Sequence, residues 1–286
     1  MSKVVFISHY GSLYGANQSL LTFIEHTTIA KTDIVVIVPE LGSFTDKLAE
    51  LGITFIKQLF SPNIYQERHH VLRRNWNGLK KLRWLIKLYL ILKKLKPVLI
   101  YSNSSILYYG FFLSKLLSVP HVWHLREFSA LHYKIHPDFG SKFQKYLLRS
   151  NTFNIAISKA ISQYYELDKS NSEIVYNGVC TLTEFDKTYQ VRSLNKPLTF
   201  GVVGAIMPNK GQLQIVKSFH QFLNTKATKE NILYLIGQSV GDYVDEICAY
   251  IKLNRLDDNI IIVGHLEDRA DIYNKFDVLI NGSRYE

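Results

Sequence analysis

Short β-branched runs alternate with longer amphipathic segments along nearly the whole chain, and this alternation restricts the folds open to it. In the first half, the candidate strands are 3–8, 33–38, 53–57, 98–102, 121–125 and 153–158. Helical patterns lie between them at 17–27, 43–51 and 105–117. Because parallel strands are joined by long crossover connections, the alternation predicts βαβ units and an open, doubly wound sheet.

A second series of the same kind follows a polar stretch at 178–197, which is charged, ends in proline and is typical of a linker. We therefore expect one domain over 1–177 and another over 198–286. The predicted strands of the second are 198–204, 231–237, 259–264 and 277–282, with helices at 210–226, 241–254 and 267–275. Doubly wound sheets commonly have more strands, and the last strand here has no covering helix behind it, so this domain is expected to be incomplete.

Composition favours a cytoplasmic protein. No apolar run approaches the roughly 20 residues of a membrane-spanning helix. The first residues, MSKVVFISHYG, are too short and too polar for a signal peptide. Cys180 and Cys248 lie far apart and form no CxxC pair, as expected of reduced structural thiols.

Strand-to-helix junctions are where an open α/β sheet binds ligands, because helix N-termini there favour anions. Neither a GxGxxG fingerprint nor a P-loop occurs at these junctions. Gly15 and Ala16 precede the first helix, and Gly204, Lys210 and Gly211 form a second loop. Small residues open the backbone amides and Lys210 adds a cation, so both loops are candidates for a diphosphate. The alternative for each loop is an ordinary βα turn.

Polar residues at strand ends of the first domain are candidates for binding the hydroxyl groups of an acceptor substrate. For His9 and Asn103, the alternative is a turn-stabilising role. For Arg126, the alternative is a surface pair with Glu127. Asn177 lies in a turn-like YNG, for which a left-handed turn accounts without any ligand.

Six runs, in chain order, carry a resemblance to a known family. They are YGANQSLL (14–21), YNGV (176–179), VGAIMPNKGQ (203–212), LIG (235–237), VGH (263–265) and YNKFDVLINGSRYE (273–286). Together they resemble glycosyltransferase family 4, and the last run is the most specific. The resemblance implies the GT-B fold, in which two Rossmann-like, doubly wound domains face each other across a cleft and bind a nucleotide sugar.

The resemblance also implies roles for individual residues. Lys210 matches the lysine that holds the donor diphosphate, and Gly15 matches the glycine loop near the phosphates. Gly204, Gly211 and Gly237, which lie in or beside the similar runs, are candidates for binding the donor. His124 matches a catalytic histidine facing the transferred sugar, and Glu286 matches the first of two glutamates that meet the sugar and ribose. The chain departs from the family at Ala205, where an arginine is usual. Arg284 and Lys217 are candidate replacements for that cation.

Breaking a sugar–diphosphate bond releases a charged leaving group, so cations and helix amides give the main electrostatic help. No acidic DxD pair is placed to hold a metal, and we expect neither metal nor cofactor, the UDP- or GDP-linked sugar being a substrate. In one route proposed for retaining members, the leaving phosphate accepts the acceptor's proton. That route accounts for the lack of paired carboxylates.

Residues 68–96 hold ten basic side chains and no acidic one. The simple interpretation is a long, solvated amphipathic helix with its leucines buried. Trp76 and Trp84 among the cations favour docking on an anionic membrane surface instead. No nucleic-acid-binding fold accompanies this charge, so nucleic acid is not an expected partner.

The resulting hypothesis is a cytoplasmic, peripherally membrane-associated glycosyltransferase. It would transfer a sugar to a glycan or lipid-linked acceptor, with retention, in surface polysaccharide or glycoconjugate synthesis. Two alternatives remain open at this point. One is a sugar-nucleotide epimerase of the same architecture, and the other is a truncated, catalytically inert protein that docks on membranes.

Overall fold

The computed structural model describes residues 2–66, 76, 78–128, 135–178, 197–225, 230–239, 241–266 and 268–283. The chain divides into two compact units, Met1–Val179 (unit 1) and Cys180–Glu286 (unit 2). The predicted linker over 178–197 lies outside the described residues except at its two ends. No helix within the described ranges combines the length and apolar character needed to cross a bilayer.

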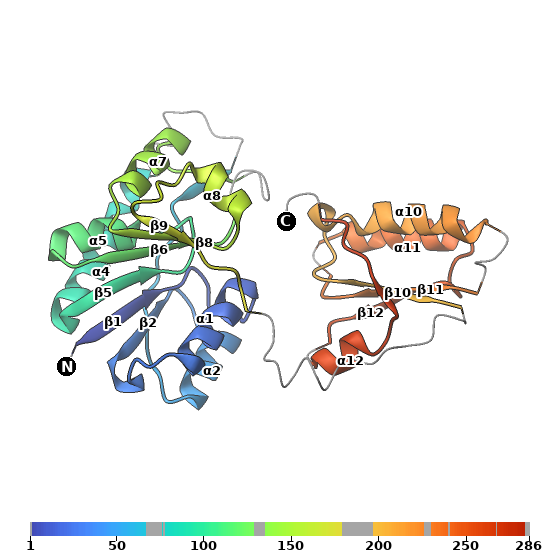
Figure 1. The fold of residues 1–286 in the computed structure, drawn as a ribbon, viewed down its shortest axis with the longest axis horizontal. Coiled ribbons are helices and arrows are strands. Elements are labelled where there is room, and N and C mark those ends of the chain that lie inside the picture. Colours follow the sequence, from blue (N-terminus) through green and yellow to red (C-terminus); the bar gives the residue numbers. More distant parts are fainter. Residues whose placement is uncertain are drawn as a thin grey trace. The chain divides into compact units, whose positions relative to one another are not determined.

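Unit 1 contains a seven-stranded, all-parallel sheet in the order β3-β2-β1-β5-β6-β8-β9 (Figure 1). The strands are β1 (Lys3–Ile7), β2 (Ile34–Val38), β3 (Thr54–Lys57), β5 (Pro97–Ser102), β6 (His121–Leu125), β8 (Phe153–Ala156) and β9 (Ser172–Ile174). Chain order reverses beside β1, so the carboxyl ends of β1 and β5 flank the switch point where open α/β sheets bind ligands. All six strands predicted for this unit are present. The seventh strand of the sheet, β9, was not predicted, because it is too short to show a sequence period.

Alternate residues of β1 explain why this sheet carries helices on both faces. Val4 and Phe6 belong to one apolar cluster, with α1 and α2, whereas Val5 and Ile7 belong to another, with α4 and α5. Successive strand side chains point to opposite faces, so a continuous apolar run needs cover on both. The helices of unit 1 are α1 (Gly15–His26), α2 (Ser43–Glu50), α4 (Leu82–Leu95), α5 (Tyr109–Leu117), α7 (Ser141–Arg149) and α8 (Lys159–Tyr165), with a 3₁₀ turn at Lys31–Asp33.

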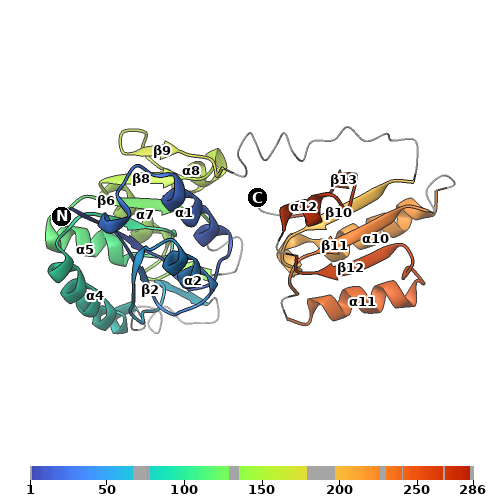
Figure 2. The same ribbon diagram turned by 90° about the horizontal axis from the view of Figure 1, so that it is seen from below.

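Unit 2 has a parallel sheet in the order β12-β11-β10-β13. The strands are β10 (Thr199–Val203), β11 (Ile232–Ile236), β12 (Ile260–Gly264) and β13 (Val278–Leu279), and the helices are α10 (Gln212–Leu223), α11 (Tyr243–Leu253) and α12 (Arg269–Tyr273). One face of the sheet packs its apolar side chains against α10 and α11. Figure 1 and Figure 2 show these two helices on that face and α12 on the other. All four predicted strands and all three predicted helices are present, with shorter bounds.

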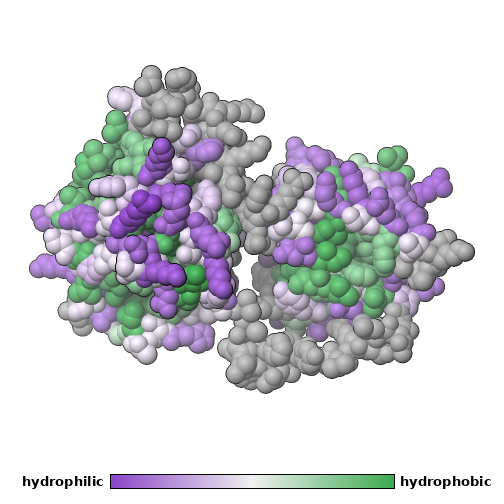
Figure 3. All heavy atoms as spheres, turned by 45° about the horizontal axis from the view of Figure 1, so that its top comes forward, coloured by the Kyte–Doolittle hydropathy of each residue, from purple (hydrophilic) through white to green (hydrophobic). Residues whose placement is uncertain are grey.

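Some elements of unit 1 differ from the sequence prediction. The helix expected over 105–117 begins only at Tyr109, because Ser104 and Ser105 are bound to Glu127 instead. Strands β4 (Ile64–Gln66) and β7 (Ile135–Pro137) pair antiparallel, and neither was predicted. The two strands lie some 70 residues apart in the chain, so no local sequence pattern predicts their pairing. The surface in Figure 3 interleaves hydrophilic and hydrophobic residues on both units.

Candidate functional site

Glycines gather at the carboxyl edge of the sheet in unit 2. Gly204 follows β10, Gly237 follows β11, Gly264 ends β12 and Gly282 lies just beyond β13. Three of them have positive φ, at 143°, 153° and 86° for Gly204, Gly237 and Gly264. Side chains are therefore absent along this edge, and a ligand can approach the backbone closely.

Glycine is required at Gly237, and also at Gly211 just before α10, because neighbouring loops approach each other at these two positions. A Cβ on Gly237 would lie 2.0 Å from the carbonyl oxygen of Gly204. A Cβ on Gly211, where φ is 71°, would lie 2.5 Å from the carbonyl oxygen of Gly282. Glycine at these positions thus brings the ends of neighbouring strands together into one rim.

Lys210 lies on this rim at the start of α10. A 3₁₀ turn at Pro208–Lys210 leads to Gly211, which is the N-cap of α10. Lys210 is half-buried, and burial lowers the pKa of its amine. Of the amides in the first turn of α10, that of Leu213 donates to the Tyr243 hydroxyl at 2.9 Å. A cation and a helix N-terminus at one place form an arrangement suited to an anion.

Ala205 stands where the family resemblance implies an arginine, and the structure shows how its loop is held. The buried Gln212 donates from Nε2 to the Ala205 carbonyl at 2.8 Å and accepts from the Met207 amide at 3.4 Å. Lys217 lies about two turns along α10 from Lys210, with its amine over the Tyr250 ring at 5.6 Å. It is therefore not brought to this loop.

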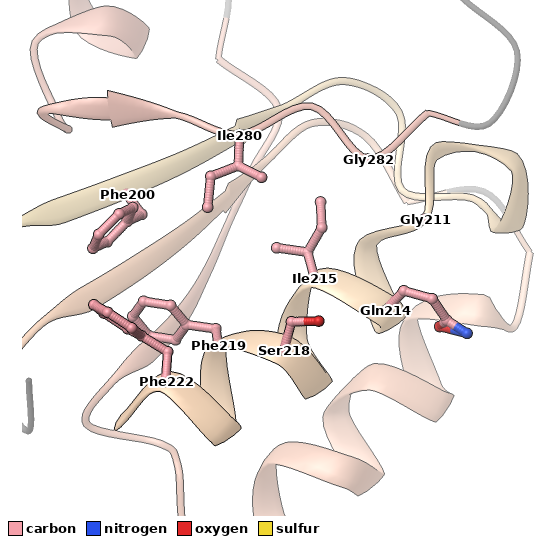
Figure 4. A pocket seen from close by; sticks show the side chains of 9 residues that line it. All are labelled: Phe200, Gly211, Gln214, Ile215, Ser218, Phe219, Phe222, Ile280 and Gly282. Carbon is pink, nitrogen blue, oxygen red and sulfur yellow. The ribbon is translucent and has the colours of Figure 1, made fainter. Parts of the chain in front are cut away.

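The remaining predicted residues of this region are Arg284 and Glu286, and both lie outside the described residues. Beside the rim, an apolar hollow of about 450 Å³ opens between α10 and the sheet (Figure 4). It is lined by Phe200, Gly211, Gln214, Ile215, Ser218, Phe219, Phe222, Ile280 and Gly282. With few polar groups, this hollow is unsuited to phosphates.

Arg126 is the centre of a second polar group, at the carboxyl edge of the sheet in unit 1. Its Nε donates to Asn103 Oδ1 at 2.8 Å, and its NH1 donates to Asn177 Oδ1 at 3.0 Å. Asn103 is fully buried and donates to the Ala16 carbonyl at 3.0 Å. Asn177 also accepts from Ser19 at 3.1 Å. The network joins the ends of β5 and β6, the first turns of α1 and the segment after β9.

His124, on β6, is held in one tautomer by this network. Arg126 NH2 donates to His124 Nδ1 at 3.1 Å, and the Tyr101 hydroxyl lies 2.5 Å from the same nitrogen. Because a guanidinium only donates, Nδ1 is the acceptor and the proton resides on Nε2. Burial, aided by Arg126, lowers the pKa of His124 to about 2, so the ring is neutral at neutral pH. Its Nε2 is buried, with no hydrogen-bond partner in the described part of the chain.

The loop between β1 and α1 is shaped by Asn17, a residue that the sequence did not single out. Its amide donates to the Tyr10 and Ser12 carbonyls at 3.0 and 2.8 Å, and its oxygen accepts from the Ser8 hydroxyl. Gly15, at the start of α1, has open space where a Cβ would lie. A ligand can therefore approach Gly15, although the fold itself does not require glycine there.

His9 packs its ring edge-on against Tyr10, with 4.1 Å between ring centroids. Burial first, and Arg126 second, lower the pKa of His9 to about 3, so this ring is also neutral at neutral pH. Its Nδ1 is buried and makes no hydrogen bond within the described residues. A neutral ring with an unused nitrogen keeps His9 a candidate for an acceptor hydroxyl.

Three interpretations from the sequence need correction. Arg126 and Glu127 form no ion pair within the described chain, since the Glu127 carboxylate accepts from Ser104 and Ser105. Burial raises the pKa of Glu127, and these hydrogen bonds oppose the rise. Asn177 does not have positive φ, so the left-handed turn proposed for it is wrong. Asn103 uses both side-chain groups internally, which leaves it a structural role.

The structure thus brings the predicted residues together in two groups, one in each unit. Gly204, Lys210, Gly211 and Gly237 share the rim of unit 2. Gly15, Ala16, Asn103, His124 and Arg126 lie around the switch point of unit 1, and His9 follows β1 there. Among the described residues, no cluster of three or more His, Cys, Asp or Glu side chains is placed to share a metal ion.

Comparison with known proteins defines the fold. No protein-family model and no curated protein sequence matches the chain. Anabaena HepE, solved with UDP and glucose, matches at a TM-score of 0.72 and 18% identity over 99% of this chain and 74% of that one. A glycosyltransferase from Rickettsia africae matches at 0.64 and 14%, over 99% and 73%. The lipopolysaccharide outer core galactosyltransferase WaaB matches at 0.66 and 16%, over 98% and 74%.

These similar structures are GT-B glycosyltransferases. The predicted α/β fold of GT-B type, built on parallel sheets, is therefore confirmed.

Proposed function

We propose that this chain is a glycosyltransferase that uses a nucleotide sugar, with UDP as the first nucleotide to test. The observation that carries the proposal is the rim of unit 2, where strand-end glycines, Lys210 and the N-terminus of α10 lie together. This rim has the chemistry of a diphosphate site. HepE, of similar fold, has been solved with UDP-glucose, which supports the choice of donor.

The rim would act chiefly on the leaving group. When the bond between the sugar and the diphosphate breaks, negative charge develops on the phosphate oxygen. A half-buried lysine is less screened than an exposed one, so Lys210 stabilises that charge more strongly. Backbone amides at the N-terminus of α10 are held in place by the helix and need no reorganisation when the charge develops. The amides of Gly204, Gly211 and Gly237 donate to backbone carbonyls within unit 2, so these glycines contribute close backbone approach rather than free donors.

On the acceptor side, we assign His124 as a neutral hydrogen-bond donor, since Arg126 and Tyr101 keep its proton on Nε2. The acceptor class that we propose is a glycan or a lipid-linked glycan in surface polysaccharide or glycoconjugate synthesis. We also propose retention. The acceptor oxygen attacks the sugar on the face from which the phosphate leaves, and the departing phosphate takes the hydroxyl proton.

Calorimetry with UDP, GDP and UDP-glucose tests the donor site. We expect heat from UDP-glucose and from one nucleoside diphosphate. An absence of heat with every nucleotide would favour the inert alternative. Conversion of the donor to an isomerised sugar nucleotide without any acceptor would favour the epimerase. Inversion of the anomeric centre, read by NMR of the product, would contradict retention.

A further inference from the structure

The outward face of α4, extended by Leu79 just before the helix, carries aliphatic side chains that the rest of unit 1 does not cover. Leu79, Leu82, Ile86 and Leu90 are each more than half exposed, at 57, 54, 55 and 54%. Their spacing of three or four residues places them in one stripe along the helix. The buried side chains of the same helix, Leu88 and Leu92, belong to the core. The expectation that the leucines of the basic stretch are buried therefore holds for only part of them.

Cations form a row beside this stripe. Lys80, just before α4, and Lys87 and Lys94 within it recur every seven residues, which is the spacing of one side of a helix. Arg83 lies on the same side at helical spacing and stacks over the Trp84 ring, 4.6 Å from its centroid; Lys87 approaches that ring at 5.0 Å. Among the described residues, none of these four cations makes an ion pair.

We propose that this stripe and its row of cations form a docking face for an anionic lipid surface. A helix that lies in the membrane interface presents aliphatic side chains to the acyl boundary and cations to the headgroups. The exposed side of α4, with Leu79 and Lys80 just before it, presents both. Lipid is favoured over nucleic acid because phosphodiester backbones offer nothing to an aliphatic stripe. It is favoured over a second copy because the row would meet its own positive charge there.

Docking on vesicles tests the proposal with the full chain. Vesicles of phosphatidylcholine, with and without phosphatidylglycerol, are incubated with the protein at low and high NaCl and then floated. We expect binding to the anionic vesicles, weakened by salt, and much weaker binding to the zwitterionic ones. Equal binding to both would remove the role of the cations.

Two sets of variants separate the two halves of the face. K80Q/K87Q/K94Q should weaken partitioning on the order of 100-fold, at about fivefold for each cation. I86Q/L90Q should weaken it by about tenfold for each side chain, including at high salt. The matched controls K31Q/K217Q/K252Q and L41Q/L253Q change exposed residues elsewhere and should bind like the wild type.

Several outcomes would overturn the proposal. One is unchanged vesicle binding by both α4 variants, with melting temperatures that show intact folding. Another is stronger binding to single-stranded RNA than to anionic vesicles. A third is a dimer in sedimentation that I86Q/L90Q abolishes. None of these readouts involves a nucleotide sugar, so the docking face and the proposed transferase activity can fail separately.

Discussion

Glycine and lysine residues at the edge of unit 2 carry most of the proposed donor chemistry. Gly204, Gly211 and Gly237 have positive φ, which lets the backbone of neighbouring loops turn and approach. Lys210 supplies a cation beside them, half-buried so that water screens it less. With Ala205 in place of the expected arginine, the dependence on Lys210 should be larger.

Lys210→Gln is expected to weaken UDP binding by about tenfold to 100-fold, since a charge-assisted hydrogen bond contributes roughly 1.5–3 kcal/mol. Calorimetry at constant salt measures the change. Lys217→Gln is the matched control, because Lys217 is exposed on α10, which begins just after Lys210, and lies over Tyr250. Equal losses in the two variants would point to a general effect of charge.

Gly237→Ala should destabilise unit 2 and abolish UDP binding. The new Cβ would meet the Gly204 carbonyl, and at φ 153° an L-residue is strained by about 1–3 kcal/mol. Gly241→Ala is the control, because φ there is 66° with open space around the Cβ, so only the modest backbone strain remains. Urea unfolding and UDP titration of both variants check this. A Gly237 variant no less stable than the Gly241 variant would contradict it.

His124→Phe should lower kcat at least about 100-fold, in the range of a lost positioned proton or hydrogen-bond donor. UDP affinity should not change, because the proposed phosphate contacts lie in unit 2. Tyr101→Phe is the milder comparison, since Arg126 still donates to His124 in that variant. A loss of UDP affinity in His124→Phe would move this residue out of its assigned role.

At the scale of elements, α4 is anchored to the antiparallel β4–β7 pair by a buried ion pair. Lys81, next to the start of α4, donates to Asp138 at 2.8 Å and to the Pro62 and Ile64 carbonyls at 2.6 and 2.8 Å. The Asp138 side chain is 0% exposed. This ion pair fixes where α4 meets strands β4 and β7 and, with the apolar packing of Leu88 and Leu92, which side of α4 faces outward.

Breaking that pair from one side should be costly. Asp138→Asn or Lys81→Met is expected to lower the free energy of unfolding of unit 1 by about 3–5 kcal/mol, because one buried charge is left uncompensated. The double variant K81M/D138L should cost less than the sum of the two single changes. For comparison, changing the exposed pair Lys47–Glu50 should cost under about 1 kcal/mol. Urea denaturation followed by circular dichroism tests all of these; additive single changes would be evidence against coupling.

At the scale of the molecule, the described part of unit 1 contains three histidines whose pKa values burial depresses. They fall from 6.5 to about 3 for His9 and His121, and to about 2 for His124. Below pH 6.5 these histidines become protonated in the unfolded chain but stay neutral in the native unit. The stability present above that pH is therefore lost as the pH falls.

For each pH unit by which the pH falls below 6.5, each such histidine lowers the free energy of unfolding by up to about 1.4 kcal/mol. Unit 1 should therefore lose stability between about pH 6.5 and 5, above the range where most carboxylates titrate. Urea unfolding across this range measures the slope. His121→Gln should reduce it by up to one proton, and a flat profile for the wild type would contradict the prediction.

The strands of both units, and the helices of unit 2, followed from local patterns wherever an element was long enough to show its period. In unit 1, helices α7 and α8 were not among the predicted ones. All ten predicted strands are present, and the bounds of β6 match the prediction to the residue. The missed elements were short or paired across long stretches of chain, as with β9 and the β4–β7 pair. The beginning of α5 was misplaced because Glu127, more than twenty residues further on, holds Ser104 and Ser105 in a loop.

By itself, the sequence determined the α/β class, the two series of strands, the basic segment and which loops hold glycine and lysine, because these depend on period, composition and neighbouring residues. Only the tertiary structure decided that Arg126 joins Asn103, His124 and Asn177, that Gly237 meets Gly204, and that α4 turns aliphatic side chains outward beside its cations. These features join residues distant in the chain or depend on which side of a helix the core covers. Local sequence preferences predict neither long-range contacts nor the side of a helix that the core covers.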